Sequence, residues 1–156
     1  MYSVEMTNSQ NIMFEAIKCA EEANSINEVP VGAIIYNSQT SQIISKSFNK
    51  TNKNLDPTAH AEINVIRDAC KILNTSRLIN CDLYVTLEPC MMCAAAISQA
   101  RIRRLYFGAD DLKYGSINGN INYFQKENTN HLPEIYDNIC SESCNRLLIN
   151  FFKERR

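Results

Sequence analysis

Short apolar runs typical of β-strands alternate with stretches of helical spacing along most of this chain. The predicted order is a helix, a hairpin, a helix, a strand, a helix, a strand, an irregular stretch with a short edge strand, and a last helix. Such alternation favours an α/β fold in which helices pack on both faces of one mixed sheet. The 156 residues show no repeat or break in composition, so we expect a single domain over residues 1–156.

Local signals predict several boundaries of these elements. Thr7 and Asn8 are possible caps of the first helix, and Thr58 is a good N-cap for a helix that begins at about Ala59. Ser141 could cap the last helix. The expected strands are 31–36, 42–48, 83–87, 103–108 and 135–139, a buried helix is expected over 90–100, and 110–132 should be mainly loop.

The cysteines bear on the cellular compartment. Their number, seven, is odd, and residues 1–30 contain no basic segment followed by an apolar run and a cleavage site. A secreted disulfide scaffold is therefore not expected, and we predict a cytoplasmic protein whose thiols are core residues or metal ligands. No stretch approaches the roughly 18 consecutive apolar residues of a membrane span.

Charge argues against one class of nucleic-acid binding. The net charge of −1 excludes a basic footprint over the whole domain. Each of two local basic clusters is most simply a solvated surface, with a local phosphate contact as the alternative. The clusters are Arg101, Arg103 and Arg104, and then Lys153, Arg155 and Arg156.

Two short motifs carry the chemistry. His60-Ala61-Glu62 alone is a weak signal, because such residues in the first turn of a helix commonly meet only solvent or the helix dipole. Cys90-Met91-Met92-Cys93 alone could be a redox pair, half of a structural zinc site or two core thiols. Together, with Pro89 immediately before the thiols, they match the His-x-Glu and Pro-Cys-x-x-Cys signature of zinc-dependent nucleobase deaminases.

This signature assigns a role to each residue. His60, Cys90 and Cys93 are expected to hold one Zn²⁺ per chain and to leave its fourth position to water, whose pKa zinc lowers to about 7. Glu62 should move protons between that water and the substrate without being a ligand. A helix N-terminus favours the thiolate forms of the two cysteines. Packing roles are expected for the others, Cys19, Cys70, Cys81, Cys140 and Cys144.

Beyond the metal motifs, the chain resembles the bacterial tRNA-specific adenosine deaminases of the cytidine and deoxycytidylate deaminase superfamily. The resemblance runs nearly end to end. It rests on Glu28-Val29-Pro30-Val31-Gly32-Ala33, Asp56-Pro57-Thr58-Ala59-His60-Ala61-Glu62-Ile63, Leu83-Tyr84-Val85-Thr86-Leu87-Glu88-Pro89-Cys90, Arg101-Ile102, Phe107-Gly108-Ala109, Asn130-His131, Phe151-Phe152 and Arg155-Arg156.

The resemblance implies a three-layer α/β/α sandwich of the cytidine-deaminase type and a homodimer. It also implies hydrolytic deamination of adenosine to inosine at the wobble position of a tRNA anticodon stem-loop, by zinc-activated hydroxide with Glu62 as the proton shuttle. The alternative within enzymes is a deaminase of a free base or nucleoside, of the guanine or cytidine type. A zinc-stabilised RNA-binding module without catalysis is a third hypothesis, and the presence of Glu62 argues against it.

The resemblance further implies a set of substrate contacts. Asn49 would contact the purine, although by composition alone it could equally be a turn residue after a strand. Phe151 or Phe152 could stack on an anticodon-loop base, and one of the two should cover the sheet because helix neighbours point about 100° apart. The remaining contacts are Pro30 and Val31 as an apolar wall, Asp111 near the flanking nucleotide, and Arg155 and Arg156 on phosphates.

The sequence departs from the family in three places. Asp110 stands where well-known members carry arginine, and Gln99 replaces a commoner histidine. Residues 117–129 are rich in asparagine and match poorly. These departures concern the RNA contacts and leave the predicted chemistry intact.

Overall fold

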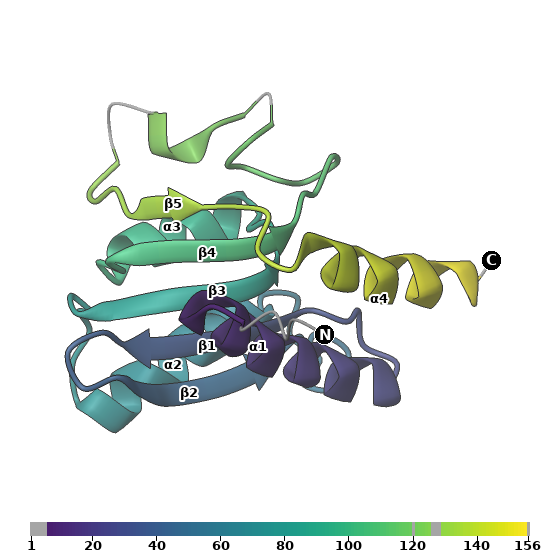
Figure 1. The fold of residues 1–156 in the computed structure, drawn as a ribbon, viewed down its shortest axis with the longest axis horizontal. Helices are drawn as coiled ribbons and strands as arrows, with labels where there is room; N and C mark the ends of the chain where they lie inside the picture. The colour runs from purple at the N-terminus through teal and green to yellow at the C-terminus, as the bar shows by residue number, and fades with distance from the viewer. Residues whose placement is uncertain (1–5, 120, 126–128, 156) are drawn as a thin grey trace, which may run out of the picture.

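The five strands form one mixed sheet in a computed structural model that describes residues 6–119, 121–125 and 129–155. The strand order is β2-β1-β3-β4-β5, with β1 antiparallel to β2 and β3, and β4 parallel to both β3 and β5. Along the chain (Figure 1) the elements are α1 (Asn8–Ser25), β1 (Gly32–Asn37), β2 (Gln42–Phe48), α2 (Ala61–Leu73), β3 (Cys81–Leu87), α3 (Met91–Gln99), β4 (Arg104–Ala109), η1 (Tyr123–Gln125), β5 (Glu134–Tyr136) and α4 (Ser141–Lys153).

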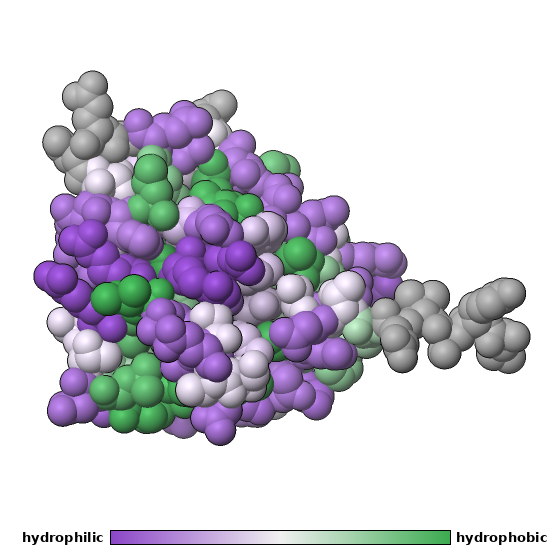
Figure 2. Space-filling view, turned by 60° about the vertical axis from the view of Figure 1, so that its left-hand side comes forward, coloured by the Kyte–Doolittle hydropathy of each residue, from purple (hydrophilic) through white to green (hydrophobic). Residues whose placement is uncertain are grey.

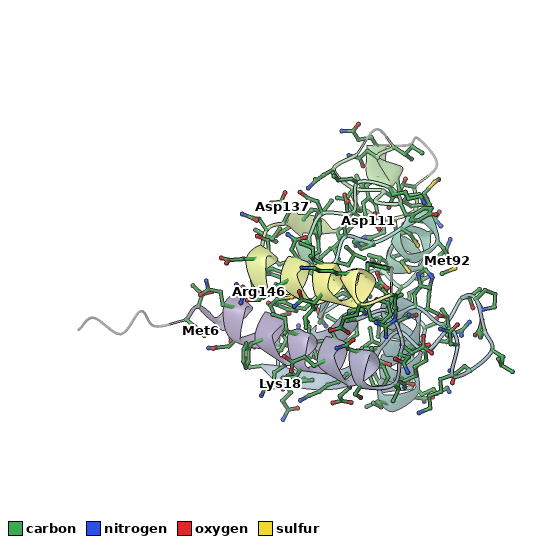
Figure 3. The ribbon with its side chains drawn as sticks, turned by 90° about the vertical axis from the view of Figure 1, so that its right-hand side faces the viewer. Met6, Lys18, Met92, Asp111, Asp137 and Arg146 are labelled. Carbon is green, nitrogen blue, oxygen red and sulfur yellow. The ribbon has the colours of Figure 1, made fainter. Side chains whose placement is uncertain are left out.

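Side chains of the central strands alternate between two hydrophobic cores, one on each face of the sheet. Ile34, Tyr84 and Tyr106 pack with α1 and α4. Their neighbours Leu83 and Leu105 pack with α2 and α3. Helices α1 and α4 lie side by side on their face (Figures 1 and 3). The structure therefore confirms the predicted three-layer α/β/α sandwich.

Helix α1 lies unusually close to strand β1. A Cβ on Gly32 would fall 2.0 Å from the Ala16 carbonyl oxygen and 2.6 Å from the Ala20 nitrogen. The small residues at 16 and 20 and the missing side chain at 32 let the two backbones meet. This contact fixes where the chain leaves α1 and enters the sheet.

Two predicted caps are wrong. Helix α2 begins at Ala61 with His60 as its N-cap, because the Thr58 amide and hydroxyl both donate to Asp56 Oδ1 and hold Thr58 in the preceding turn. Helix α4 begins at Ser141 itself, with Cys140 as the N-cap in a left-handed conformation. The predicted cap at Thr7 is confirmed, since its side chain accepts a hydrogen bond from the Gln10 amide.

Strand β5 is shorter and earlier than expected. It covers only Glu134–Tyr136 and pairs in parallel with the start of β4, whereas 135–139 was the predicted range. The other predicted strands and helices are found within a few residues of their expected ends.

The outer surface is mixed in polarity. Apolar side chains form separate patches between polar ones on the face drawn in Figure 2. No helix in the described part of the chain is long and apolar enough to span a bilayer.

Candidate metal centre and active site

The predicted metal ligands come from the starts of two helices on the same face of the sheet. His60 is the N-cap of α2, Cys90 is the N-cap of α3, and Cys93 lies in the first turn of α3. Helices α2 and α3 contact each other. The chain therefore brings together residues 30 and 33 positions apart at the end of the sheet where β3 terminates.

The three ligand atoms are spaced as a zinc site requires. His60 Nδ1 lies 3.7 Å from Cys90 Sγ and 3.5 Å from Cys93 Sγ, and the three atoms all lie within 4.8 Å of one another. Zinc–sulfur and zinc–nitrogen bonds of about 2.3 and 2.0 Å put tetrahedral ligand atoms roughly 3.5–3.8 Å apart. The His-Cys-Cys set fits Zn²⁺ in both spacing and chemistry.

In the metal-free cluster the two thiols differ in acidity, because the contact with Cys90 and burial raise the pKa of Cys93. The hydrogen bond with the Cys93 thiol, followed by the one with His60, lowers the pKa of Cys90 to about 4 despite its partial burial. The pKa of His60 is raised, mainly by the same contact with Cys90. Cys90 is thus held as a thiolate, the form in which cysteine binds a metal.

Glu62 lies in the first turn of α2, two residues after His60, and its side chain is buried. Burial raises the pKa of this carboxyl to about 7, opposed in part by its own backbone amide and by His60. A carboxyl of this pKa can both take up and release a proton near neutral pH. This is the property that a proton shuttle needs.

Asn49, Pro30 and Val31 lie together beside this centre. The backbone amide of Asn49 donates to the Val31 carbonyl. The backbone amide of Lys50 donates to the carbonyl of Ala59, which precedes His60. Asn49 and the two predicted wall residues are all buried. The structure therefore brings together the polar and the apolar residues that were assigned to the base pocket.

Asp111 has a defined structural task. Its Oδ1 accepts hydrogen bonds from the amides of Lys113 and Tyr114, which closes a tight turn in the loop after β4. Asp110 is exposed and accepts a bond from Asn118. The Asp111 carboxylate thus shapes a loop at the rim of the site.

Two buried carboxylates that the sequence reasoning missed hold the segments around the site. Glu88 accepts hydrogen bonds from the amides of Asp111, Ile117 and Asn118, at 3.0, 3.3 and 2.6 Å. Glu28 holds the segment after Asn49 in a similar way. Both lie in segments that resemble the family, but neither the resemblance nor the local sequence reveals their hydrogen-bond partners.

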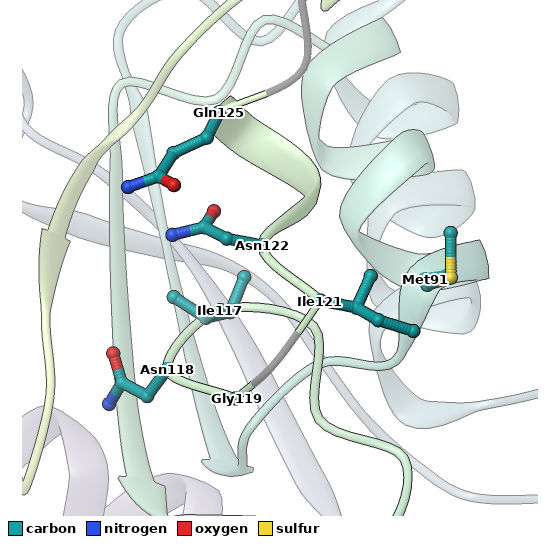
Figure 4. A pocket seen from close by; sticks show the side chains of 7 residues that line it. All are labelled: Met91, Ile117, Asn118, Gly119, Ile121, Asn122 and Gln125. Carbon is teal, nitrogen blue, oxygen red and sulfur yellow. The ribbon is translucent and has the colours of Figure 1, made fainter.

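A cavity of about 610 Å³ lies between the start of α3 and the Asn-rich segment after β4. Met91, which follows the ligand Cys90, forms part of its wall (Figure 4). Amide and apolar side chains of the Asn-rich segment supply the rest of the lining, so this poorly matching stretch forms most of the cavity wall.

The two phenylalanines near the C-terminus differ in exposure. Phe151 is buried, whereas Phe152 is half exposed. Arg155 stacks over the Phe151 ring at 3.5 Å and donates to Phe151 O and to Asn27 Oδ1. Arg156 lies outside the described residues.

The remaining thiols pack in the interior, as expected. Cys19, Cys81 and Cys144 are buried, and Cys70 and Cys140 are partly buried against the two cores. Burial raises the pKa of Cys19 and Cys81 to about 11 and that of Cys144 to about 12. None of them shares the electrostatics of Cys90.

Comparison with known proteins identifies relatives across the whole chain. Residues 7–156 match the family model of the MafB19-like deaminases. The chain is 48% identical to the tRNA-specific adenosine deaminase of Rickettsia bellii (strain RML369-C), over 92% of this chain and 99% of that protein. It is 41% identical to the protein of the same name from Bacillus subtilis (strain 168), over 97% of this chain and 92% of that one.

Solved structures agree with the sequence relatives. A chain from a study of A-to-I editing by tRNA:A34 deaminases at the wobble position of transfer RNA has a TM-score of 0.85 and 44% identity, over 88% of this chain and 99% of that one. Guanine deaminase from Nitrosomonas europaea has a TM-score of 0.80 at 18% identity, over 96% of this chain and 86% of that one. The second likeness shows the shared fold alone.

Proposed function

This chain belongs to the family of tRNA-specific adenosine deaminases, and from that premise we propose that it converts adenosine to inosine at the wobble position of a tRNA anticodon. The reaction consumes one water and releases one ammonia. The observation that carries the proposal is the meeting of His60, Cys90 and Cys93 beside the buried carboxyl of Glu62.

We propose that His60, Cys90 and Cys93 hold one Zn²⁺ per chain, since their atoms have the spacing and the chemistry of a three-ligand zinc site. Zinc bound there would lower the pKa of a coordinated water to about 7.

Glu62 is the proton carrier of the proposed reaction. Its carboxylate accepts a proton from the attacking water and passes it to a ring nitrogen of adenine as the water oxygen adds to C6. Glu62 then takes the second proton from the hydroxyl added at C6 and gives it to the amine. The C6 carbonyl forms as the C6–N bond breaks and the amine leaves as ammonia. In the metal-free protein the pKa of about 7 leaves both forms of Glu62 accessible near neutral pH.

The base pocket is proposed to consist of Asn49, Pro30 and Val31, which lie together beside His60. Pro30 and Val31 would cover the apolar faces of the purine, and the Asn49 amide would bond to a polar edge.

Nucleotides around the target base are proposed to meet the loop of Asp111 and the C-terminal end of α4. The exposed ring of Phe152 is the better placed of the two phenylalanines for stacking on a loop base, with Phe151 supporting it from below. Arg155 and Arg156 are proposed phosphate contacts.

We also propose a homodimer acting in the cytoplasm, where tRNA occurs and cysteines stay reduced. Sedimentation equilibrium should give twice the mass of the 17.8 kDa chain.

The substrate is tested by comparing two targets. We expect an anticodon stem-loop with adenosine at the wobble position to be converted to inosine, and free adenosine to be left unchanged. Sequencing of the RNA product checks this, because inosine reads as guanosine. Equal turnover of both targets, or turnover of free guanine or cytidine, would favour the alternative of a base or nucleoside deaminase.

The roles of the site residues are tested by two substitutions. Glu62→Ala should abolish deamination and keep about one zinc per chain, because Glu62 is not a ligand. Cys90→Ala should lose both the activity and the metal. Loss of zinc from Glu62→Ala would instead make Glu62 a ligand and overturn its assignment as proton carrier.

A further inference from the structure

Glu28 lies almost completely buried between α1 and β1, with 1% of its surface exposed. Its own amide donates to the carbonyl of Ala23 at the end of α1, which fixes its backbone. No lysine or arginine in the described part of the chain forms an ion pair with it. A buried carboxylate of this kind needs hydrogen-bond donors from the protein.

Three donors from the segment after β2 surround this carboxylate. Lys53 N donates to Oε1 at 2.6 Å, while Asn49 Nδ2 and Thr51 Oγ1 each lie 3.4 Å from Oε2. Because an ionised carboxylate can only accept hydrogen bonds, the side-chain amide of Asn49 must point its nitrogen, Nδ2, toward Glu28. The orientation of this side chain is therefore imposed by its partner.

The other end of the Asn49 amide has no partner. Asn49 is 7% exposed, and its Oδ1 is a buried acceptor without a hydrogen bond in the described part of the chain. An unpaired buried acceptor is costly, which makes this oxygen a strong attractor for a donor on a bound ligand.

We propose that Glu28 is a positioning residue that sets the direction of the Asn49 amide, so that Oδ1 accepts a hydrogen bond from the substrate. The inference rests on the proposed function, in which Asn49 lines the base pocket. The matching ligand group carries an N–H or O–H: within an RNA loop, the exocyclic amine of the base or the ribose 2′-hydroxyl.

The substitution Glu28→Gln tests this orientation with little change of shape. The glutamine oxygen can keep the bond from Lys53 N, which leaves its NH₂ group at the place of Oε2. Asn49 then keeps a hydrogen bond only by reversing its amide, so that NH₂ instead of Oδ1 faces the pocket. The variant should fold normally and bind about one zinc per chain.

Kinetics on the anticodon stem-loop give the first readout. Glu28→Gln should lower kcat/KM about 10- to 100-fold, mainly through KM, since the contact is made before as well as during the reaction. In the Asn49→Ala background the same substitution should have no further effect, because the residue that it positions is gone. A full additional loss in that background would make Glu28 merely structural and overturn the proposal.

Two comparisons complete the kinetic test. Glu15→Gln is the matched control, because Glu15 bonds to Lys18 and Lys46 on the outer surface, and kcat/KM should stay within about twofold. A stem-loop with 2′-deoxyadenosine at the target position separates the two donors. If the penalty of Glu28→Gln disappears there, the 2′-hydroxyl is the donor, and if it persists, the base amine is.

A second readout needs no activity. In the wild type, one Nδ2 proton of Asn49 should exchange slowly with solvent, because it bonds to the buried Glu28. In Glu28→Gln both protons should exchange faster, and the NMR signals are assigned by their loss in Asn49→Ala. Equal exchange in wild type and variant would overturn the positioning role. A wild type that exchanges slowly but leaves the RNA unchanged would refute the proposed function alone.

Discussion

Three glutamates, Glu28, Glu62 and Glu88, are at most 4% exposed, and none forms an ion pair in the described part of the chain. Glu28 and Glu88 are surrounded by donors, mostly backbone amides, that stabilise a negative charge. At Glu62 burial dominates, and the pKa of its carboxyl is raised to about 7. Two carboxylates therefore serve as fixed anchors, and one is free to exchange a proton.

The raised pKa of Glu62 predicts a stability cost. In the unfolded chain the carboxyl ionises above about pH 4.5, whereas in the folded, metal-free protein it stays protonated until about pH 7. The free energy of unfolding of the metal-free protein is therefore highest below about pH 4.5, and the contribution of Glu62 is lost as the pH rises through about 7. Glu62→Gln removes this loss, so at pH 8 the metal-free variant should be more stable than wild type by roughly 3 kcal/mol.

Thermal unfolding of the chelator-treated proteins at two pH values checks this. The Tm of Glu62→Gln should exceed that of wild type by several degrees at pH 8, and the two should nearly coincide at pH 4.5. A difference of equal size at both pH values would mean that ionisation of Glu62 does not cause it.

The clustering of His60, Cys90 and Cys93 could be predicted from the sequence, because they occur in short local motifs at helix starts. The anchoring role of Glu28 could not. Its donors are 21 to 25 residues away and are partly backbone amides, which have no sequence signature. The role of Glu88 could not be predicted either, because its donors are backbone amides 23 to 30 residues away.

At the scale of elements, the loop after β4 is fixed to the end of β3. Glu88 accepts from three of its amides, and the amide and hydroxyl of Ser116 both donate to the carbonyl of Pro89, which precedes the ligand Cys90. The exposed side chains of Leu112 and Tyr114 are thus carried on a well-anchored loop beside the metal centre. Such a loop loses little freedom when RNA binds.

Gly115 is the residue that permits this anchoring. A Cβ there would lie 1.8 Å from Glu88 Oε2 and 2.4 Å from the Asp111 carbonyl oxygen. Gly115→Ala must therefore displace the loop, and we expect a loss of about 1–3 kcal/mol in stability and a raised KM for the stem-loop, with zinc content unchanged.

Gly119 in the same segment is the matched control. Within the described part of the chain, its nearest neighbour lies 3.4 Å from the position of an added Cβ, so Gly119→Ala should leave Tm close to wild type. If Gly115→Ala behaves like this control, the glutamate does not hold the loop as the structure indicates.

Most elements could be predicted from the spacing of apolar residues, because the two faces of the sheet need two sets of alternating side chains. The errors occur where tertiary contacts decide. Thr58 is a good cap by composition, yet Asp56 takes its hydroxyl. Strand β5 has only three residues, all exposed, so its pairing with β4 leaves almost no hydrophobic pattern.

Over the whole molecule, basic side chains occur at both ends of the sheet, and those at the start of β4 are paired with acidic residues. Arg103 and Arg104 lie near the start of β4, where they pair with Asp82 and Glu134. The metal centre lies at the opposite end, about 20 Å away along strands of this length. The last turn of α4 extends past this second end (Figure 1), and Arg155 bonds there to Asn27, the neighbour of Glu28.

This arrangement predicts which basic residues meet RNA. With a net charge of −1, attraction must come from local contacts. Removing one phosphate contact should reduce the steepness of the slope of log K against log salt concentration by about 0.7–0.9. Lys153, exposed in the last turn of α4, should give such a change when replaced by Gln.

The measurement is KM for the stem-loop between 50 and 200 mM NaCl. Three phosphate contacts by Lys153, Arg155 and Arg156 would raise KM roughly 20-fold over this range in the wild type. Arg104→Gln is the control, because Arg104 is paired with Glu134 at the far end and should leave the slope unchanged. If instead Arg104→Gln reduces the slope and Lys153→Gln does not, the RNA must approach from the opposite end of the sheet, and the C-terminal helix is not its docking site.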